Sequence, residues 1–315
     1  MRTTYTESLI ASDVQADAKD LATRFARRDP FRHVVIDHFF APDFAARLMD
    51  EFPPFERGNA RNEAGELGRK STFDRIRKLG PGFTQLDNLI RSRNFLDLIG
   101  RITGIEELLY DPWYFGGGTH ENRDGQDLDP HVDFNRHPIE PWHRRLNLIV
   151  YLNRAWDDAW GGSLELHSDP RAANDRIERI TPLHNRCVIF ETTESSWHGF
   201  PPIALPPEHR DVTRKSIALY FYTRERPADE LADAHSTIYV DQPLPEHIRP
   251  GLTLSEHDVT EIQSLLARRD QHNQRLYRDI TALSTQLEQA RLTLNASVLG
   301  RIALYARRAL QRLRR

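Results

Sequence analysis

The stretch LNLIVYLN, residues 146–153, is the strongest strand signal in the sequence. Aliphatic, β-branched and aromatic residues fill it, which is typical of a strand inside a sheet. Further runs of this kind surround it: LLYDPWYFGGG (108–118), GGSLELHS (161–168), RCVIF (186–190) and KSIALYFYT (215–223). Gly, Pro, Asn and Asp separate the runs, and this punctuation favours an all-β sandwich or jelly roll. A nucleotide-binding α/β domain is disfavoured, because the sequence has no Gly-rich phosphate loop between a strand and a helix.

The chain outside this β region has a different character. Four regions are predicted: an N-terminal helical and strand support region (1–105), the β core (106–226), a Pro-rich linker (227–255) and a helical tail (256–315). Within the first region we expect a strand in FRHVVIDHFF (31–40), a helix in APDFAARLMDEF (41–52), a polar loop (57–72) and helices within 84–104 that stop at Gly104.

The helical tail carries two patterns. Apolar residues recur at steps of four and three, which predicts a coiled-coil seam and a homodimer: Leu276, Ile280, Leu283, Leu287, Ala290 and Leu294. The last stretch, LGRIALYARRALQRLRR (299–315), places apolar residues on one helical face among arginines. That second pattern is compatible with an amphipathic helix on an anionic membrane surface. Both interpretations remain open.

Composition limits the partners and the compartment. The net charge of -3 over 315 residues gives no drive toward nucleic acid. The single cysteine, Cys187, lies in an apolar run and is interpreted as a buried thiol rather than a nucleophile. We find no apolar leader and no run long enough to span a membrane. The expected location is therefore the cytoplasm, with the inner face of the membrane as the site of any tail contact.

The segment DPHVDFNRHP (129–138) contains a candidate metal site. Residues i and i+2 of a strand share a face, so His131 and Asp133 would point to one position. Such a pair is weak evidence alone, and a second one, His209 with Asp211, lies in a Pro-rich loop. The first pair is followed by His198 in SSWHGF (195–200). Two histidines and one carboxylate form the facial triad of non-haem Fe(II) oxygenases.

An arginine on the next strand completes the set. Arg214 opens the strand RKSIALYFYT and has the forked donors that suit a carboxylate. Lys215 and Arg210 are the rival cations. Lys215 is expected on the opposite strand face and Arg210 in a loop, so Arg214 is preferred.

Together these motifs resemble the prolyl 4-hydroxylase-like branch of the Fe(II)/2-oxoglutarate-dependent dioxygenases. The matching segments are HVD, LNLIVYLNRAWDDAWGGSLELHSD, SSWHGF and RKSIALYFYT, within residues 110–225, with a weaker likeness in VVIDHFFAPDFAARLMDEFP (34–53). The resemblance implies a double-stranded β-helix, a distorted jelly roll, with flanking N-terminal helices; the helical tail lies outside it. It also implies that Fe(II) is held by His131, Asp133 and His198 and that Arg214 binds 2-oxoglutarate. The spacing from His198 to Arg214 is longer than in many relatives.

Other residues are assigned less specific roles. Tyr151 stands where relatives carry a tyrosine that binds the same carboxylate, although a core aromatic is the alternative interpretation. Asn147 lies on the same strand face and Ser216 on the face of Arg214, so both are candidate pocket residues. The loop 134–143 is a candidate lid; the roles of its histidines, His137 and His143, stay open.

The resemblance implies hydroxylation of a C–H bond, with O2 consumed and 2-oxoglutarate converted to succinate and CO2. Asp133 argues against a halogenase, because halogenases of this kind lack the carboxylate ligand. The expected substrate is a prolyl or peptidyl group, or a saccharide. The alternative is a non-catalytic jelly-roll binding module with a degenerate or structural metal site. The intact set of His131, Asp133, His198 and Arg214 speaks against this alternative.

Overall fold

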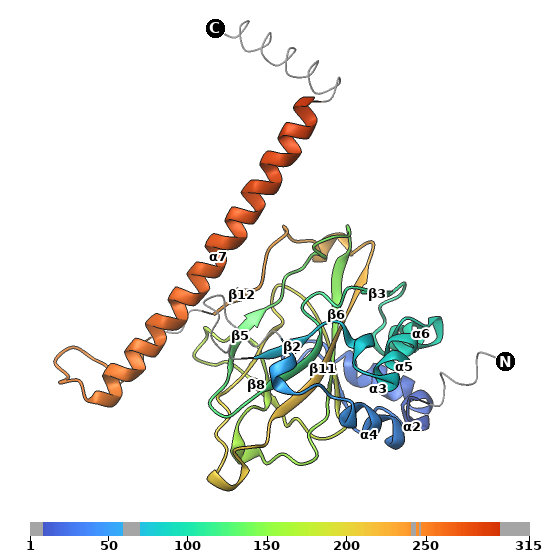
Figure 1. Cartoon of the computed structure of the whole chain (residues 1–315), viewed down its shortest axis with the longest axis horizontal. Coiled ribbons are helices and arrows are strands. Elements are labelled where there is room, and N and C mark those ends of the chain that lie inside the picture. Colours follow the sequence, from blue (N-terminus) through green and yellow to red (C-terminus); the bar gives the residue numbers. More distant parts are fainter. Residues whose placement is uncertain (1–8, 59–69, 241–243, 246, 297–315) are drawn as a thin grey trace, which may run out of the picture. The chain divides into compact units, whose positions relative to one another are not determined.

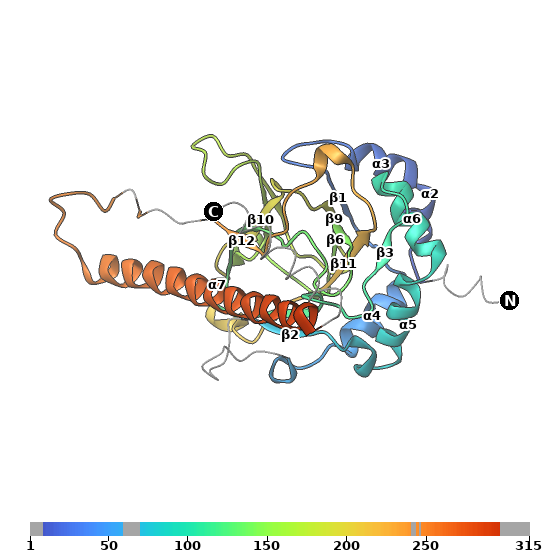
Figure 2. The same cartoon turned by 90° about the horizontal axis from the view of Figure 1, so that it is seen from above.

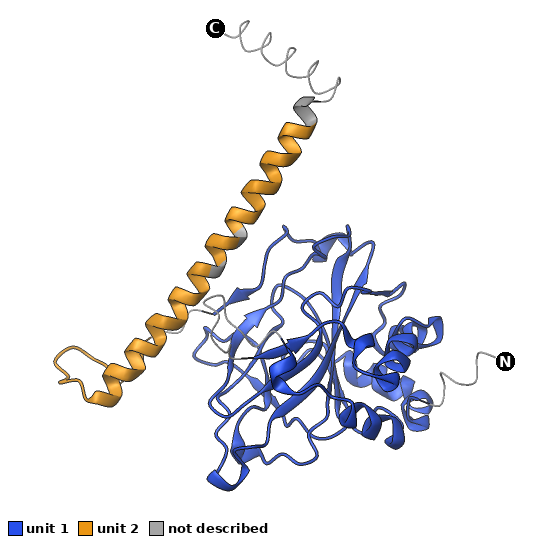
Figure 3. Cartoon of the chain, viewed as in Figure 1, with its two compact units in different colours: residues 1–240 blue, residues 241–315 orange. Residues whose placement is uncertain are grey.

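The computed structural model describes residues 9–58, 70–240, 244–245 and 247–296. The chain divides into two compact units, Met1–Val240 and Asp241–Arg315 (Figure 3). The predicted division into four regions remains a prediction. The first unit contains the β core and its helices, and the second contains one long helix.

Two antiparallel sheets form the core of the first unit. In the described residues the larger sheet has the order β1 (His33–Ile36), β9 (Cys187–Glu191), β6 (His143–Tyr151), β11 (Arg214–Thr223), β4 (Gly118–Asn122), β2 (Ser71–Phe73), with β3 (Leu109–Tyr110) on β11. The smaller sheet has the order β12 (Ile238–Tyr239), β5 (Leu128–Val132), β10 (Trp197–Phe200), β7 (Leu164–His167), β8 (Ile177–Ile180). This arrangement is the predicted double-stranded β-helix.

Helices cover the outer face of the larger sheet (Figures 1 and 2). They are α2 (Ser12–Ala16), α3 (Ala18–Phe25), α4 (Pro42–Asp50), α5 (Pro81–Ile90) and α6 (Arg93–Thr103). Their apolar faces form one cluster with Leu146, Leu148 and Val150 of β6. The alternate residues of β6 face inward, where Tyr151 packs with Leu164 and Leu166 of the smaller sheet. Strand alternation therefore divides an apolar packing face from the interior of the β-helix.

The N-terminal predictions agree well with these elements. β1 and α4 lie within the predicted strand and helix. α6 ends at Thr103 and is capped, as predicted, by Gly104, which adopts the left-handed conformation with φ 71°. Cys187 is fully buried, and burial raises the pKa of its thiol well above the usual value. The interpretation as a buried thiol is confirmed.

Several short strands were not predicted. The predicted loop 57–72 is wrong at its end, because Ser71 and Thr72 belong to β2; residues 59–69 lie outside the described residues. The predicted linker contains β12, and no strand was predicted at the positions of β4, β8 or β10. These strands have two to five residues, too few for a clear alternation pattern, and their pairing with neighbours holds them in place.

The second unit contains α7 (Glu256–Ala296), which includes the whole of the predicted seam. Its apolar residues are exposed: Leu276 48%, Ile280 57%, Leu283 64% and Leu287 72%. Residues 299–315 lie outside the described residues. Coiled-coil pairing and membrane contact remain predictions. Among the described helices, none is both long and apolar enough to cross a membrane.

Candidate metal centre

Three predicted ligands converge inside the smaller sheet. His131 on β5 lies directly opposite His198 on β10, and their ring centroids are 4.3 Å apart. Asp133 follows the end of β5. Its carboxylate oxygens lie 3.8 Å from Nε2 of His131 and 3.5 Å from Nε2 of His198. The three ligand atoms are within 4.8 Å of one another.

Both histidine rings are oriented by the backbone. Nδ1 of His131 lies 2.9 Å from the carbonyl oxygen of Asp129, and Nδ1 of His198 lies 2.9 Å from that of Ser196. A carbonyl can only accept a hydrogen bond, so each Nδ1 carries the proton. Each Nε2 is then left with a free lone pair facing Asp133. This is how metal-binding histidines are held in proteins, and it fits a divalent iron at this position.

The protonation states also suit a metal. Burial, together with the charge of His198, lowers the pKa of His131 to about 3, and burial lowers the pKa of His198. Burial acts to raise the pKa of Asp133, but the charge of Arg144 and the two histidines outweigh it and hold the pKa well below its usual range. At neutral pH the centre therefore offers two neutral imidazoles and one carboxylate.

Asp133 has partners that the sequence did not reveal. Asn147 donates from Nδ2 to Oδ2 of Asp133 at 2.7 Å, and Arg144 lies 3.0 Å from the same oxygen. The guanidinium of Arg144 is fully buried and stacks over the rings of Tyr220 and Phe134, with its centre 3.6 and 4.4 Å from their centroids. Within the part of the chain that the structure describes, Nη1 of Arg144 has no hydrogen-bond partner. This leaves a buried donor beside the metal ligands.

Arg214 lies in the interior with two of the other candidates. Its guanidinium donates to the carbonyl oxygen of Gly162 and, from Nη2, to the hydroxyl of Tyr151 at 3.2 Å. Ser216 pairs with Tyr151 across the two strands and is buried. Among the described residues no carboxylate forms an ion pair with Arg214, so the site has a buried cation suited to an anionic ligand.

The rival cations lie elsewhere. Nζ of Lys215 is 2.7 Å from Glu121, on the opposite face of β11 from Arg214, as alternation predicts. Arg210 follows the short helix Pro207–His209 and is exposed. His209 stacks on Trp160 with centroids 4.8 Å apart. The second His-x-Asp pair is therefore not part of the triad.

The two loop histidines have structural partners. His137 is buried beside Asp111, and its Nδ1 accepts hydrogen bonds from the amides of Ile139 and Glu140. Nε2 of His143 lies 2.6 Å from the guanidinium of Arg136. Both histidines thus hold the loop 134–143 together. Whether that loop acts as a lid remains a prediction.

Sequence reasoning also missed a lysine that interacts electrostatically with the centre. Burial lowers the pKa of Lys70, the charge of Asp133 raises it, and the charges of Arg214 and Arg144 lower it, giving about 8. Lys70 in turn lowers the pKa values of His120 and His131. It precedes a three-residue strand within a polar stretch, so its sequence context gave no signal.

A second group of possible metal ligands lies in the second unit. It consists of His247, Asp258 and Glu261, and Asp258 already accepts hydrogen bonds from Ser255 at the start of α7.

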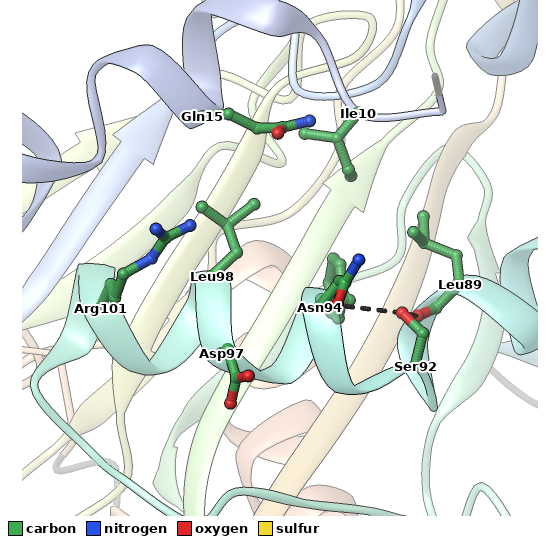
Figure 4. A pocket seen from close by; sticks show the side chains of 9 residues that line it. Ile10, Gln15, Leu89, Ser92, Asn94, Asp97, Leu98 and Arg101 are labelled. Atoms are coloured by element: carbon green, nitrogen blue, oxygen red, sulfur yellow. Dashed lines mark hydrogen bonds between the residues drawn. The ribbon is translucent and has the colours of Figure 1, made fainter. Parts of the chain in front are cut away.

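Figure 4 shows a pocket of the first unit between the N-terminal segment and α6. It is lined by Ile10, Gln15, Leu89, Ser92, Asn94, Phe95, Asp97, Leu98 and Arg101. None of these residues belongs to the metal centre.

Residues 117–222 match the family model of the 2OG-Fe(II) oxygenase superfamily. We call these matched residues the oxygenase segment. The oxygenase segment contains the triad, Arg214 and Tyr151, which are the residues on which the sequence resemblance was based.

Known relatives of this oxygenase segment include prolyl hydroxylases. The chain is 23% identical over 237 residues to mouse prolyl 3-hydroxylase OGFOD1, a match covering 69% of this chain and 38% of that protein. This chain thus spans well under half of the relative's length. Two solved structures are similar. A Trichoplax adhaerens prolyl hydroxylase in complex with a hypoxia inducible factor peptide has 14% identity and a TM-score of 0.47, and the match covers 69% of this chain and 95% of that one. A Pseudomonas putida prolyl-4-hydroxylase has 17% identity and a TM-score of 0.40, and the match covers 70% of this chain and 97% of that one. The predicted resemblance to the prolyl hydroxylase-like branch is confirmed.

Proposed function

We propose that this chain is an Fe(II)- and 2-oxoglutarate-dependent hydroxylase of a prolyl or peptidyl C–H bond. The observation that carries the proposal is the convergence of His131, Asp133 and His198, with both histidine Nε2 atoms free to bind metal. The match of residues 117–222 to the 2OG-Fe(II) oxygenase family model supports the reaction class. The likeness to mouse prolyl 3-hydroxylase supports the peptidyl over the saccharide substrate.

Each residue has a defined task in this proposal. His131, Asp133 and His198 hold iron, which supplies the activation of O2 against the substrate C–H bond. Arg214 binds a carboxylate of 2-oxoglutarate, and the hydroxyl of Tyr151 orients the guanidinium. Asn147 and Arg144 fix the carboxylate of Asp133. The burial of these groups keeps water away from the reacting atoms.

An exposed aromatic surface supports a peptide substrate. Trp113 and Phe115 are 43% and 46% exposed, and their ring partners Trp142 and Phe134 are only partly buried. Phe115 packs edge-on against Phe134, the residue next to Asp133, with centroids 5.7 Å apart. Flat apolar rings near a reactive centre suit an extended, proline-containing segment.

The first test is spectroscopic. The anaerobic chain is mixed with Fe(II) and 2-oxoglutarate, and the visible charge-transfer band is recorded for the parent chain, His131→Ala and Arg214→Ala. We expect a band in the parent, none in His131→Ala and a weakened one in Arg214→Ala. A folded parent chain without a band would favour the non-catalytic binding module instead.

The second test addresses the substrate. Proline-containing peptides and a panel of oligosaccharides are incubated with the iron-loaded chain, 2-oxoglutarate and air. A gain of one oxygen atom on a prolyl residue, matched by succinate, is the expected result. Oxygen gained by a saccharide alone would contradict the peptidyl assignment while leaving the reaction class intact.

A further inference from the structure

The register of the larger sheet turns Lys70 toward the interior. β2 pairs with β4 with Ser71 opposite Glu121 and Thr72 opposite His120. Extending this antiparallel register by one residue places Lys70 opposite Asn122. Residues opposite each other on antiparallel strands project to the same face.

The same row continues to Arg214. Asn122 pairs with Arg214 on β11, so Lys70, Asn122 and Arg214 lie in one row across three neighbouring strands. With strands about 4.8 Å apart, the Cα atoms at the two ends of the row are roughly 10 Å from each other. Ser71 points the other way, since its hydroxyl donates to the carbonyl oxygen of Phe55.

The electrostatic interactions of Lys70 agree with this position on the interior face. Its ammonium is attracted by Asp133 at the metal centre and repelled by Arg214 and Arg144. Its charge also acts on His120 and His131. Register and charge together place Lys70 on the interior face, near Asp133 and Arg214.

The described carboxylates near Lys70 and Arg214 do not neutralise both of these cations. Arg144 is paired with Asp133, and a metal ion at the triad would take up the remaining charge of that carboxylate. Lys70 and Arg214 are then left without a dedicated anion among the described residues. Buried or half-buried cations are costly unless an anion compensates them. A ligand with two carboxylates supplies two negative charges.

We propose that Lys70 is a second cationic anchor for 2-oxoglutarate, acting beside Arg214. This assignment rests on the proposed function, because it takes the co-substrate from it. Charge-assisted contacts of this kind are stronger than neutral hydrogen bonds. Lys70 directly precedes the edge strand β2, whereas Arg214 begins β11, which lies inside the sheet. Two independent elements would thus hold one dianion.

The test measures binding rather than turnover. The full chain is loaded with Mn(II) under anaerobic conditions and titrated with 2-oxoglutarate by calorimetry. We expect Lys70→Met to weaken 2-oxoglutarate binding by about 10- to 100-fold, the range for loss of a charged hydrogen bond. Lys70→Arg keeps the charge and should recover most of the affinity. Affinity for Mn(II) itself should stay at the parent value in both variants.

Two further variants make the result decisive. Lys78→Met removes an exposed lysine and should leave 2-oxoglutarate binding unchanged. Arg214→Met should weaken it strongly. A Lys70→Met chain that binds within about twofold of the parent, while Arg214→Met fails, overturns the role of Lys70 and leaves the proposed function standing. A parent chain that binds Mn(II) but not 2-oxoglutarate overturns both.

Discussion

Nδ2 of Asn147 donates a hydrogen bond to Oδ2 of Asp133 across 2.7 Å. The amide of Asn147 is held in turn by Arg144, which donates to Oδ1 at 2.7 and 3.1 Å. Because an amide offers donors on one side and an acceptor on the other, this arrangement fixes its orientation. Asn147 therefore positions a metal ligand, whereas its strand face alone suggested a pocket lining.

Replacement of Asn147 should lower the affinity for metal more than the affinity for 2-oxoglutarate. Asn147→Ala frees one oxygen of Asp133, and loss of such an outer hydrogen bond typically lowers metal affinity about 10- to 100-fold. Titration with Co(II), followed by its visible absorption, measures the change. Asn94→Ala, on the exposed face of α6, is the matched control. Parent-like Co(II) affinity in Asn147→Ala would show that Arg144 alone suffices to orient Asp133.

Replacement of Tyr151 tests a single hydroxyl in the proposed 2-oxoglutarate site. Tyr151→Phe removes only the hydroxyl that accepts from Arg214, and the ring still fills its fully buried position. We expect 2-oxoglutarate affinity to fall about 3- to 10-fold, with metal affinity unchanged. Calorimetric titration of both ligands measures the two effects separately. A parent-like affinity for 2-oxoglutarate would make Tyr151 a core aromatic only.

Lys215 and Arg214 are neighbours in sequence, but we expect replacement of Lys215 to reduce stability and replacement of Arg214 to reduce 2-oxoglutarate binding. Lys215→Met leaves the carboxylate of Glu121, only 6% exposed, without its ammonium partner. The free energy of unfolding should fall by about 1–3 kcal/mol, while 2-oxoglutarate binding persists. Arg214→Met should lose binding instead. Denaturant unfolding and ligand titration of both variants check this, and loss of binding in Lys215→Met would contradict the assigned strand faces.

Much of the site could be predicted because its residues lie in strands with clear patterns. Alternation along β6 and β11 assigns Tyr151 and Arg214 to the interior, and the long apolar runs identify these strands. His131 and His198 come from short strands, but their residue types identified them. The metal-binding chemistry of the histidine side chains identified these positions, although the secondary-structure pattern around them is weak.

Arg144 could not be predicted because the alternation of β6 is interrupted. Leu146 lies opposite Phe221 and Arg144 opposite Tyr222, so Arg145 is an extra residue in the ladder. Such a bulge reverses which face the residues before it occupy. Simple alternation from Asn147 would have placed Arg144 on the outer face. Lys70 was missed for another reason: only pairing with β4 brings it to the site.

Buried histidines should make the metal-free chain sensitive to acid. The pKa of His131 is lowered to about 3, and burial also lowers the pKa values of His120 and His198. In the unfolded chain each histidine titrates near 6.5. Between these values the unfolded state binds more protons than the folded state. The free energy of unfolding therefore falls as pH decreases, by at most about 1.4 kcal/mol per pH unit for each histidine.

This stability is fully present above about pH 6.5 and, for His131, is lost as the pH falls toward about 3. Urea unfolding of the metal-free chain at a series of pH values between these limits measures the slope. His131→Ala should reduce the slope by up to one proton, whereas His257→Ala, at an exposed position, should leave it unchanged. Equal slopes in the parent and His131→Ala would mean that His131 is protonated in the folded chain. A protonated His131 could not bind metal without releasing that proton, so the metal affinity of the parent would then decline steeply over the same pH range.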